Sequence, residues 1–305
     1  MKVEEKSLCV FIHYSEYPSI PKSVRIYIEE LSNYFDQVIL VTNQRVITTG
    51  LRFPQQNIST TFVKNEGYDL GMFYKIFLTI DIKEYSQIAC INDSNILFNE
   101  LFPIFNWSKK SQFDFWGIID SDEKPWFSTH QNNHHIQTHF IVFNQKAVAE
   151  LPSFFKSINI KCIFEENDPI ELRRLVIDKW EIGLTQFLTE RGLSSGSYVD
   201  SQSFSQLHHL DKTTNIGHKL YVELIHSGLP LLKKKIITQK SWKDIFHPKK
   251  QWEKLIRQYG NPDWNIDELI DELIQIENES ENQSIIKIKT KLWEPRHLLL
   301  HEKTA

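Results

Sequence analysis

Short runs of apolar residues alternate with longer amphipathic stretches along the first half of the chain. The runs are too short for buried helices and are bounded by polar residues, so they predict buried β-strands. The predicted strands are Leu8–Ile12, Val38–Val41, Thr60–Val63, Ile88–Ile91 and Phe115–Ile119. Between them, the spacing of apolar residues predicts helices over Val24–Phe35, Met72–Ile80 and Glu100–Phe105. Continuous apolar strands separated by helices are typical of a parallel sheet covered on both faces.

The second half of the chain is more helical. Residues Gln137–Phe143 alternate like a half-exposed strand, and a helix is expected to begin at Lys146. The further predicted helices are Pro169–Lys179, Glu181–Arg191, Lys219–Ser227, Trp242–Tyr259 and Ile266–Ile276. We therefore expect an α/β fold with a Rossmann-type, mostly parallel sheet flanked by helices in residues 1–240. Residues 241–305 are expected to form a helical C-terminal extension and a polar tail.

The last predicted helix carries an apolar stripe made of Ile266, Leu269, Leu273 and Ile276, on an otherwise acidic segment. Such a stripe either packs a surface helix onto its own chain or binds a partner protein. Both interpretations stay open at the level of sequence, including association with a complex or with a membrane surface through this helix.

Composition narrows the class of protein. Of the 305 residues, 41% are hydrophobic and 24% are charged, as in packed globular proteins. The net charge of −4 gives no basic field for nucleic acid. Cys9, Cys90 and Cys162 show no metal or redox spacing and indicate thiols in a reducing compartment. The N-terminal apolar run is too short for a signal peptide or a membrane span. We expect a cytoplasmic protein that could still lie peripherally at the inner face of the membrane.

Polar residues follow the predicted strands one after another. They are His13-Tyr14, Thr42-Asn43, Asn65–Gly71, Asn92–Ser94 and Asp120. Ligands of open α/β sheets bind beyond the carboxyl ends of the strands, where such loops converge. This repetition favours a binding site at that edge over loops that are polar for solubility alone.

Asn92-Asp93-Ser94 ends the predicted strand Ile88–Ile91. A carboxylate in this place can hold Mg²⁺ or Mn²⁺ and bridge it to the phosphates of a substrate. Equally, Asp93 or Ser94 could cap a turn that enters a helix. The glycines of Asn65–Gly71 permit close approach of the backbone to a ligand, although the spacing is not that of a P-loop or of a dinucleotide fingerprint.

A histidine group lies in "STHQNNHHIQTHF". His135 and His139 are four residues apart, which on a strand is about 13 Å, too far for one metal ion. Hydrogen bonds from these histidines to substrate hydroxyls or phosphate are the preferred interpretation. A zinc-dependent hydrolase remains a third alternative for the chain.

Taken together, these segments resemble the rhamnan synthesis F family of glycosyltransferases. The resemblance runs through "VFIHYSEYPSIPKSV", "NEGYDLGMFYKIF", "CINDSNILFNEL", "DFWGIID", "HHIQTHFIVFNQKAV" and "NIGHKLYVELIHSGLPLLKK", between about residues 10 and 234. It implies a GT-A-like transferase that moves L-rhamnose or a similar sugar from a nucleotide-diphosphate donor onto a cell-surface polysaccharide or lipid-linked glycan. It also implies that Asp93 holds the metal or diphosphate, and that Asn43, Asn65, Gly67 and Asp69 contact the donor.

We assign roles to the remaining polar and aromatic candidates as hypotheses. Glu181 is the expected general base, Asp120 and Asp122 are rivals for that role, and Lys233 or Lys234 could assist a Mn²⁺ or Mg²⁺ ion in neutralising the diphosphate. The expected donor contacts are His13, Tyr14, Thr42, Asn43, Asn65, Gly67, Asp69, Lys75, Asn92, Ser94 and Lys233. The expected acceptor contacts are Trp116, Trp126, His135 and His139. The runner-up function is a catalytically silent carbohydrate-binding or scaffold module of a polysaccharide assembly complex.

Overall fold

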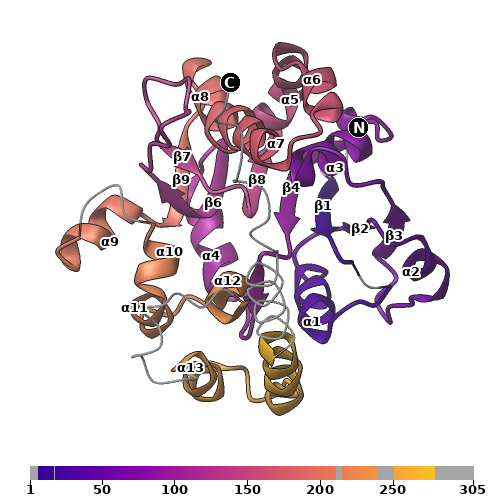
Figure 1. Cartoon of the computed structure of the whole chain (residues 1–305), viewed down its shortest axis with the longest axis vertical. Coiled ribbons are helices and arrows are strands. Elements are labelled where there is room, and N and C mark those ends of the chain that lie inside the picture. Colours follow the sequence, from indigo (N-terminus) through magenta and orange to yellow (C-terminus); the bar gives the residue numbers. More distant parts are fainter. Residues whose placement is uncertain (1–5, 17, 211–214, 239–250, 279–305) are drawn as a thin grey trace, which may run out of the picture.

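A computed structural model describes residues 6–16, 18–210, 215–238 and 251–278. Within them, one sheet of eight strands has the order β3-β2-β1-β4-β8-β6-β7, with β9 also paired to β6 (Figure 1). The strands are β1 (Lys6–His13), β2 (Gln37–Thr42), β3 (Ile58–Phe62), β4 (Tyr85–Asn92), β6 (Phe115–Ser121), β7 (His135–Ile136), β8 (Phe140–Asn144) and β9 (Ser195–Val199).

Strand direction decides which loops meet. Strands β3, β2, β1 and β4 are mutually parallel, and β8 runs antiparallel to both β4 and β6. Strand β6 therefore points the same way as β4, and the carboxyl ends of β1, β2, β4 and β6 lie at one edge with the beginning of β8. The expected mostly parallel α/β sheet flanked by helices is confirmed.

Helices cover both faces of the sheet. They are α1 (Lys22–Leu31), α2 (Arg45–Gly50), α3 (Tyr68–Phe77), α4 (Phe102–Ser111), α5 (Gln145–Ser157), α6 (Ile160–Glu165), α7 (Pro169–Val176), α8 (Gly183–Glu190), α9 (Ser201–Leu207), α10 (Ile216–Lys219), α11 (Tyr221–His226), α12 (Lys234–Thr238) and α13 (Gln251–Tyr259). Residues 266–278 are also helical. A 3-10 turn, η1 (Ile82–Glu84), precedes β4, and a π-helical segment, η2 (Ile177–Ile182), joins α7 to α8.

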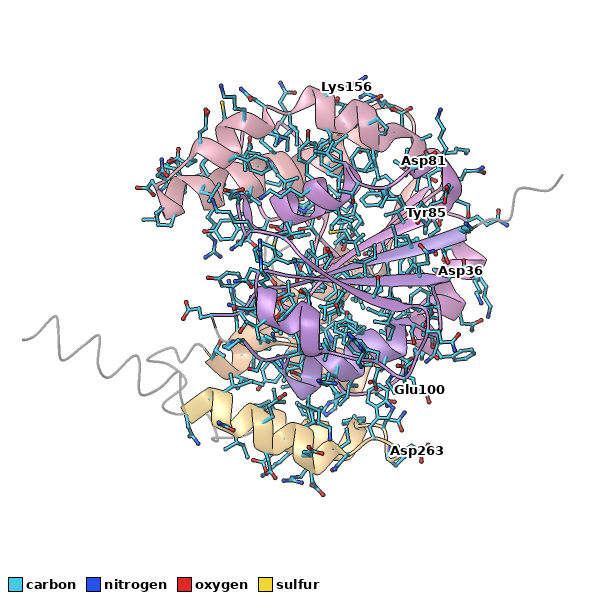
Figure 2. The ribbon with its side chains drawn as sticks, turned by 90° about the vertical axis from the view of Figure 1, so that its right-hand side faces the viewer. Asp36, Asp81, Tyr85, Glu100, Lys156 and Asp263 are labelled. Atoms are coloured by element: carbon cyan, nitrogen blue, oxygen red, sulfur yellow. The ribbon has the colours of Figure 1, made fainter. Side chains whose placement is uncertain are left out.

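The two-residue period of β1 explains the two cores. Leu8, Val10 and Ile12 pack with α3, α5 and α8 in one cluster, while Cys9 and Phe11 pack with α1 and α4 in the other. Figure 2 shows the sheet from the side, between a layer that contains the pink helices α5–α8 and a layer that contains α1. The strands are buried on both faces, which explains their continuous apolar runs.

The structure differs from the sequence prediction where periodicity is interrupted. Of the predicted strand Gln137–Phe143, only the residues from Phe140 onward form a strand, β8. The residues before it form a turn that follows β7, in which Phe140 N donates to Gln137 O over 3.5 Å. The two helices predicted from Pro169 to Arg191 are continuous through the π-helical segment. Strand β9 escaped prediction because "SGSYV" is only half-buried and has no apolar run.

The C-terminal helices form a third core with the first part of the chain. Strand β10 (Leu231–Lys233) pairs antiparallel with β5 (Asn95–Leu97), and Ile96 and Phe98 pack there against Leu269 and Leu273. Glu272 also caps α1 from the other end of the sequence, accepting from Lys22 N at 2.6 Å and from Ser23 N at 3.0 Å.

These contacts answer the question about the apolar stripe. Leu269 and Leu273 are buried against the chain's own core, so the structure does not support the predicted association with a complex or a membrane through this stripe. The predicted domain boundary at residue 240, the beginning of the predicted helix Trp242–Tyr259 and the polar tail lie outside the described residues. Among the described helices, none is both long enough and apolar enough to span a bilayer.

Candidate functional site

Asp93 lies at the centre of a charged cluster at the carboxyl edge of β1 and β4. Its Oδ2 atom accepts from His13 Nδ1 and from Lys234 Nζ, each at 2.7 Å. Burial alone would raise the pKa of the Asp93 carboxyl, but the charge of Lys234 and the hydrogen bond from His13 outweigh it and lower the pKa to about 2. Asp93 is therefore ionised and already paired with a cation of the protein.

Backbone and side-chain hydrogen bonds fix the turn that carries Asp93. Asp93 N donates to Ile12 O at 3.1 Å, which extends the pairing of β4 with β1 by one residue. The Asn92 side chain, and not Asp93, caps the turn, because its Oδ1 accepts from Ser94 N at 3.1 Å and from Ser94 Oγ at 2.6 Å. Lys234 N donates to Ser94 O at 2.9 Å, which brings the start of α12 against this turn. The turn Asn92–Ser94 thus holds Asp93 and Lys234 close to each other.

Asp69 and Glu181 form an acidic pair beside the turn Asn92–Ser94. Asn92 Nδ2 donates to Asp69 Oδ2 at 3.1 Å, so the β4 turn also positions the first turn of α3. Burial and, after it, the negative charge of Glu181 together raise the pKa of Asp69 to about 6. Glu181 comes from the π-helical segment, a rare geometry that is frequent at functional sites.

Lys233 connects the acidic group to the histidine segment. Its Nζ donates to Gln137 Oε1 at 2.9 Å and lies 3.5 Å from Asn215 Oδ1. Burial lowers the pKa of Lys233 to about 8, opposed by the negative charge of Glu181. Burial and the charge of Lys233 lower the pKa of His139 to about 3, so this imidazole is neutral. A basic amine and a neutral histidine therefore face the same edge as Glu181.

Several buried polar atoms near this edge have no hydrogen-bond partner among the described residues. They are His13 Nε2, Asn95 Nδ2 and Gln137 Nε2. Asn95, His139 and Lys233 line a cavity of about 10 Å³, about the size of one water molecule. Unpaired buried polar groups are costly, so these three atoms indicate positions that a ligand or bound water completes.

The loops after β1, β2 and β3 hold the other predicted donor residues. Tyr14 is exposed, Thr42 is buried with its Oγ1 accepting from Gln44 N at 3.2 Å, and Asn43 bonds both the N and the O atoms of Ser15 at 2.9 Å. Asn43 thus fixes the β1 loop, which makes it a positioning residue and leaves its predicted donor contact untested.

The segment Asn65–Gly71 enters α3 through a left-handed residue. Gly67 has φ +77°, and a Cβ there would lie 2.7 Å from Ile163 Cγ2, so both conformation and space require glycine. Asn65 Oδ1 is buried and has no partner among the described residues. Lys75 is bound instead to Glu66 Oε2 at 2.5 Å and to Lys64 O at 2.8 Å, so the predicted donor lysine is engaged in an ion pair.

Asp120 is the last residue but one of β6 and lies at the same edge. Its Oδ1 accepts from Ser201 N at 2.6 Å, and burial raises the pKa of its carboxyl. His134 contacts both rivals for the base, with Nδ1 3.1 Å from Asp122 Oδ1 and Nε2 3.8 Å from Asp120 Oδ2. His135 is buried and donates to Asn133 O at 2.7 Å. Asp120 and His135 therefore hold loops in place, and their catalytic and acceptor roles stay predictions.

The predicted aromatic acceptor residues separate into two kinds. Trp116 is 2% exposed and packs in the core against Phe105 and Phe140, so the structure gives it no surface to offer a sugar. Trp126, in the loop after β6, is 80% exposed and carries the guanidinium of Arg174 at 4.6 Å from its ring centre. Of these two tryptophans, only Trp126 exposes its ring, and its contact with an acceptor stays a prediction.

The donor set around Asp93 does not fit a divalent cation well. Asp93 Oδ2 already receives Lys234 and His13, and Asn92 Oδ1 is taken by Ser94. A metal ion bound to Asp93 would lie against the ammonium of Lys234 and would be repelled by it. In the described part of the chain, no group of three or more His, Cys, Asp or Glu side chains could hold a metal. The predicted Mn²⁺ or Mg²⁺ thus lacks a ligand set among the described residues.

Two positioning residues escaped the sequence analysis. Gln137 and Asn215 hold the ammonium of Lys233 but lie 96 and 18 residues from it in the sequence. Their only signal was membership of the segments "HHIQTHF" and "NIGHKL", whose polar residues are not explained by amphipathic periodicity. Long-range pairs of this kind become visible only once the sheet order is known.

Comparison with protein families decides the relationship of the chain. The model of the family described as rhamnan synthesis protein F matches residues 20–299. The chain belongs to the rhamnan synthesis protein F family. The family match continues beyond residue 234, the end of the segments that resemble the family by eye, and it includes the C-terminal helices that complete the third core. The GT-A-like class expected from the resemblance is consistent with this membership and with the sheet described above.

Solved structures resemble the chain only distantly. A putative nucleotide-diphospho-sugar transferase from Desulfovibrio desulfuricans is 10% identical, with 84% of this chain and 98% of that chain covered and a TM-score of 0.37. A 4-diphosphocytidyl-2C-methyl-D-erythritol synthase from Anaerococcus prevotii is 12% identical over 72% and 99%, with a TM-score of 0.40. A putative glucose-1-phosphate thymidylyltransferase from Bacillus anthracis is 8% identical over 64% and 86%, with a TM-score of 0.39. Similarities this low carry no argument. The search of curated proteins found no match.

Proposed function

We propose that this member of the rhamnan synthesis protein F family is a glycosyltransferase that moves rhamnose or a similar sugar from a nucleotide-diphosphate donor to a growing polysaccharide. The observation that carries the proposal is the meeting of two groups at one sheet edge. One is the cationic group of Lys233 and Lys234, and the other is the acidic pair Asp69 and Glu181. Sugar transfer needs both, because a diphosphate leaves on one side while a hydroxyl loses its proton on the other.

Lys234 supplies positive charge for the leaving diphosphate. Its ammonium is held by Asp93 at 2.7 Å and keeps further donor hydrogens for phosphate oxygens. Lys233 lies next to it, and Lys235 adds an exposed positive charge that contributes to the lowered pKa of Lys233. A donor whose diphosphate lies against these amines would have its developing charge neutralised as the sugar–phosphate bond breaks.

Glu181 is the proposed general base. Its neighbour Asp69 has a pKa raised to about 6 by burial and by the negative charge of Glu181, and a perturbed carboxyl beside a second carboxylate is typical of functional sites. In the transfer, the acceptor oxygen bonds to the anomeric carbon of the sugar, the bond from that carbon to the diphosphate oxygen breaks, and Glu181 takes the acceptor proton. Attack from the side opposite the diphosphate inverts the anomeric centre.

The acceptor side of the site is proposed to include Trp126. Its exposed ring, with Arg174 stacked on it, is a rigid apolar surface in the loop that follows Asp120. His139 is a neutral hydrogen-bonding group at the same edge. The rhamnose donor, the inversion and the cytoplasmic location stay predictions from the sequence, as does the use of a divalent cation, which the ligand set of Asp93 does not favour.

Transfer and donor hydrolysis by Glu181→Gln test the proposal. With dTDP-rhamnose as donor, we expect Glu181→Gln to lower turnover by about 10²- to 10⁴-fold, the contribution of a general base, with nearly unchanged donor affinity. The matched control is Glu190→Gln, an exposed acid on the adjacent helix α8.

The same assay with a chelator tests the predicted cation. We expect the rate of transfer to persist, because Lys234 occupies the carboxylate of Asp93.

Two results would contradict the proposal in different ways. Near-normal turnover in Glu181→Gln would remove the base assignment alone. A wild-type protein that neither binds nor hydrolyses any member of a panel of nucleotide sugars would remove the transferase itself. That second result would favour the catalytically silent carbohydrate-binding module.

A further inference from the structure

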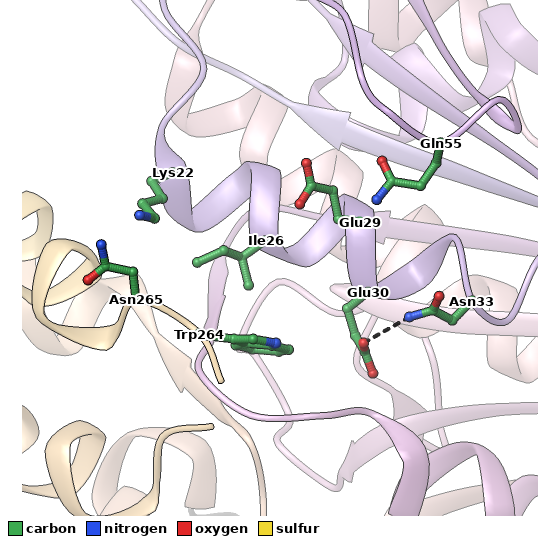
Figure 3. Close-up of a pocket in the computed structure, with 8 residues that line it drawn as sticks. All are labelled: Lys22, Ile26, Glu29, Glu30, Asn33, Gln55, Trp264 and Asn265. Carbon is green, nitrogen blue, oxygen red and sulfur yellow. Dashed lines mark hydrogen bonds between the residues drawn. The ribbon is translucent and has the colours of Figure 1, made fainter. Parts of the chain in front are cut away.

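A pocket of about 310 Å³ lies between α1 and the segment before the last described helix (Figure 3). Lys22, Ile26 and Glu29 line it along one face of α1, and Asn33 lines it just after the end of that helix. Figure 3 shows the Trp264 ring opposite this face of α1, below Ile26. A volume of this size falls within the lower range of small-molecule sites.

The pocket contains polar groups that are not used by the fold. Gln55 Oε1 is buried and has no hydrogen-bond partner among the described residues. Within the same part of the chain, the Glu29 carboxylate makes no hydrogen bond or ion pair, although the residue is half-buried. Glu30 is the opposite case, because its carboxylate accepts from Leu101 N, Tyr34 Oη and Asn33 Nδ2 and is held rigid. Glu29 and Gln55 are therefore the groups left for a ligand.

The chemistry of these groups selects a class of ligand. The flat ring of Trp264 can pack on the apolar C–H face of a sugar ring, while Glu29 and Gln55 accept hydrogen bonds from its hydroxyls. Two glutamates line the pocket, and its one cation, Lys22, is paired with Glu268. A phosphate or a charged nucleotide would be repelled here, so the pocket suits a neutral sugar rather than the donor.

The place of the pocket in the fold links it to the catalytic edge. Helix α1 begins after the loop that carries His13 and Tyr14, so Lys22 lies at the carboxyl edge of the sheet and Asn33 lies toward the opposite edge. Helix α1 therefore runs from the edge that carries the proposed transfer site past the pocket. We propose that the Trp264 pocket, defined by Ile26, Glu29, Gln55 and Trp264, is a second binding site for neutral sugar residues of the growing glycan. This inference rests on the proposed transferase function.

Calorimetric titration of the full chain with short neutral rhamnan fragments, and with neutral glucan fragments for comparison, tests the pocket. We expect binding by the wild-type protein, and a loss of affinity of at least about tenfold in Glu29→Ala and in Trp264→Ala, since each removes a buried contact to the sugar. Glu29→Ala removes no contact of the fold, so its melting temperature should stay unchanged even if Trp264→Ala is destabilised. Glu190→Ala, an exposed acid outside the pocket, is the matched control and should bind as the wild type does.

Trp126→Ala separates this site from the acceptor site. If fragment binding is lost in Trp126→Ala and retained in Glu29→Ala and Trp264→Ala, the sugars bind at the sheet edge and the inference is overturned. It is also overturned if no fragment binds the wild-type protein. Neither result depends on turnover, so donor hydrolysis by the same preparation shows separately whether the transferase function stands.

Discussion

Removing the charge of Lys234 should release a large electrostatic interaction with Asp93. The two side chains are 26% and 16% exposed and their charged atoms lie 2.7 Å apart. The pKa of Asp93 falls from its ordinary 3.8 to about 2, which corresponds to about 2.5 kcal/mol in favour of the ionised form. Burial pushes the pKa the other way, so Lys234 and His13 together contribute more than this net amount. We expect about 1–3 kcal/mol of coupling between Lys234 and Asp93.

A double-mutant cycle measures this coupling. Urea unfolding of the wild type, Lys234→Met, Asp93→Asn and the double variant at pH 7 gives the interaction free energy of the pair. A depressed pKa stabilises the fold above the unfolded-state value, so the contribution should be complete above about pH 4 and should disappear as the pH falls through about 2. A coupling below about 0.5 kcal/mol at pH 7 would refute the account of the cluster, because that is the range of distant, independent sites.

Two further predictions concern the neighbouring loops. Because the pKa of Asp69 is raised, its contribution to the stability of the fold is present below about pH 4 and is lost as the pH rises through about 6. Asp69→Asn should therefore flatten the dependence of the unfolding free energy on pH in this window. If chemical denaturation shows the same pH dependence in the variant as in the wild type, the Asp69 carboxyl is not perturbed. Gly67→Ala should destabilise the protein by about 1–3 kcal/mol from backbone strain and contact with Ile163. The control Gly192→Ala has φ +79° but no atom within 4 Å, so thermal unfolding should show a smaller loss there; equal losses would mean that Ile163 gives way.

The sequence predicted the parts of the fold that depend on local periodicity. The apolar runs Leu8–Ile12 and Ile88–Ile91 are buried strands because alternate residues of each face two separate cores. Order within the sheet was beyond this reasoning, since the placement of β8 between β4 and β6 arises from pairing across the chain. Short elements such as β5 and β10 were missed because each has only three residues.

The sequence predicted polar residues at the sheet edge, but not which of them contact one another. Polar residues at strand ends pointed to the edge at which Asp93 and Lys234 meet, because parallel strands bring their carboxyl ends together. The pairing of Asp93 with Lys234, 141 residues away, could not be read from local pattern. Trp116 was predicted to contact the acceptor and is instead a core residue. An aromatic residue in a strand suits either place, and only its exposed fraction of 2% shows that it belongs to the core.

The positions of Lys233 and Lys234 depend on residues that follow the predicted domain boundary at residue 240. Lys233 ends β10 and Lys234 begins α12, and β10 is held by its pairing with β5 directly after the Asp93 turn. The helical residues 266–278 pack on the same β5–β10 pair through Leu269 and Leu273, and Glu272 caps α1 beside it. The third core therefore holds the two lysines in register with the sheet edge. A function that needs both cations at the diphosphate requires the C-terminal helices as structural support, which is consistent with a family match that extends across them.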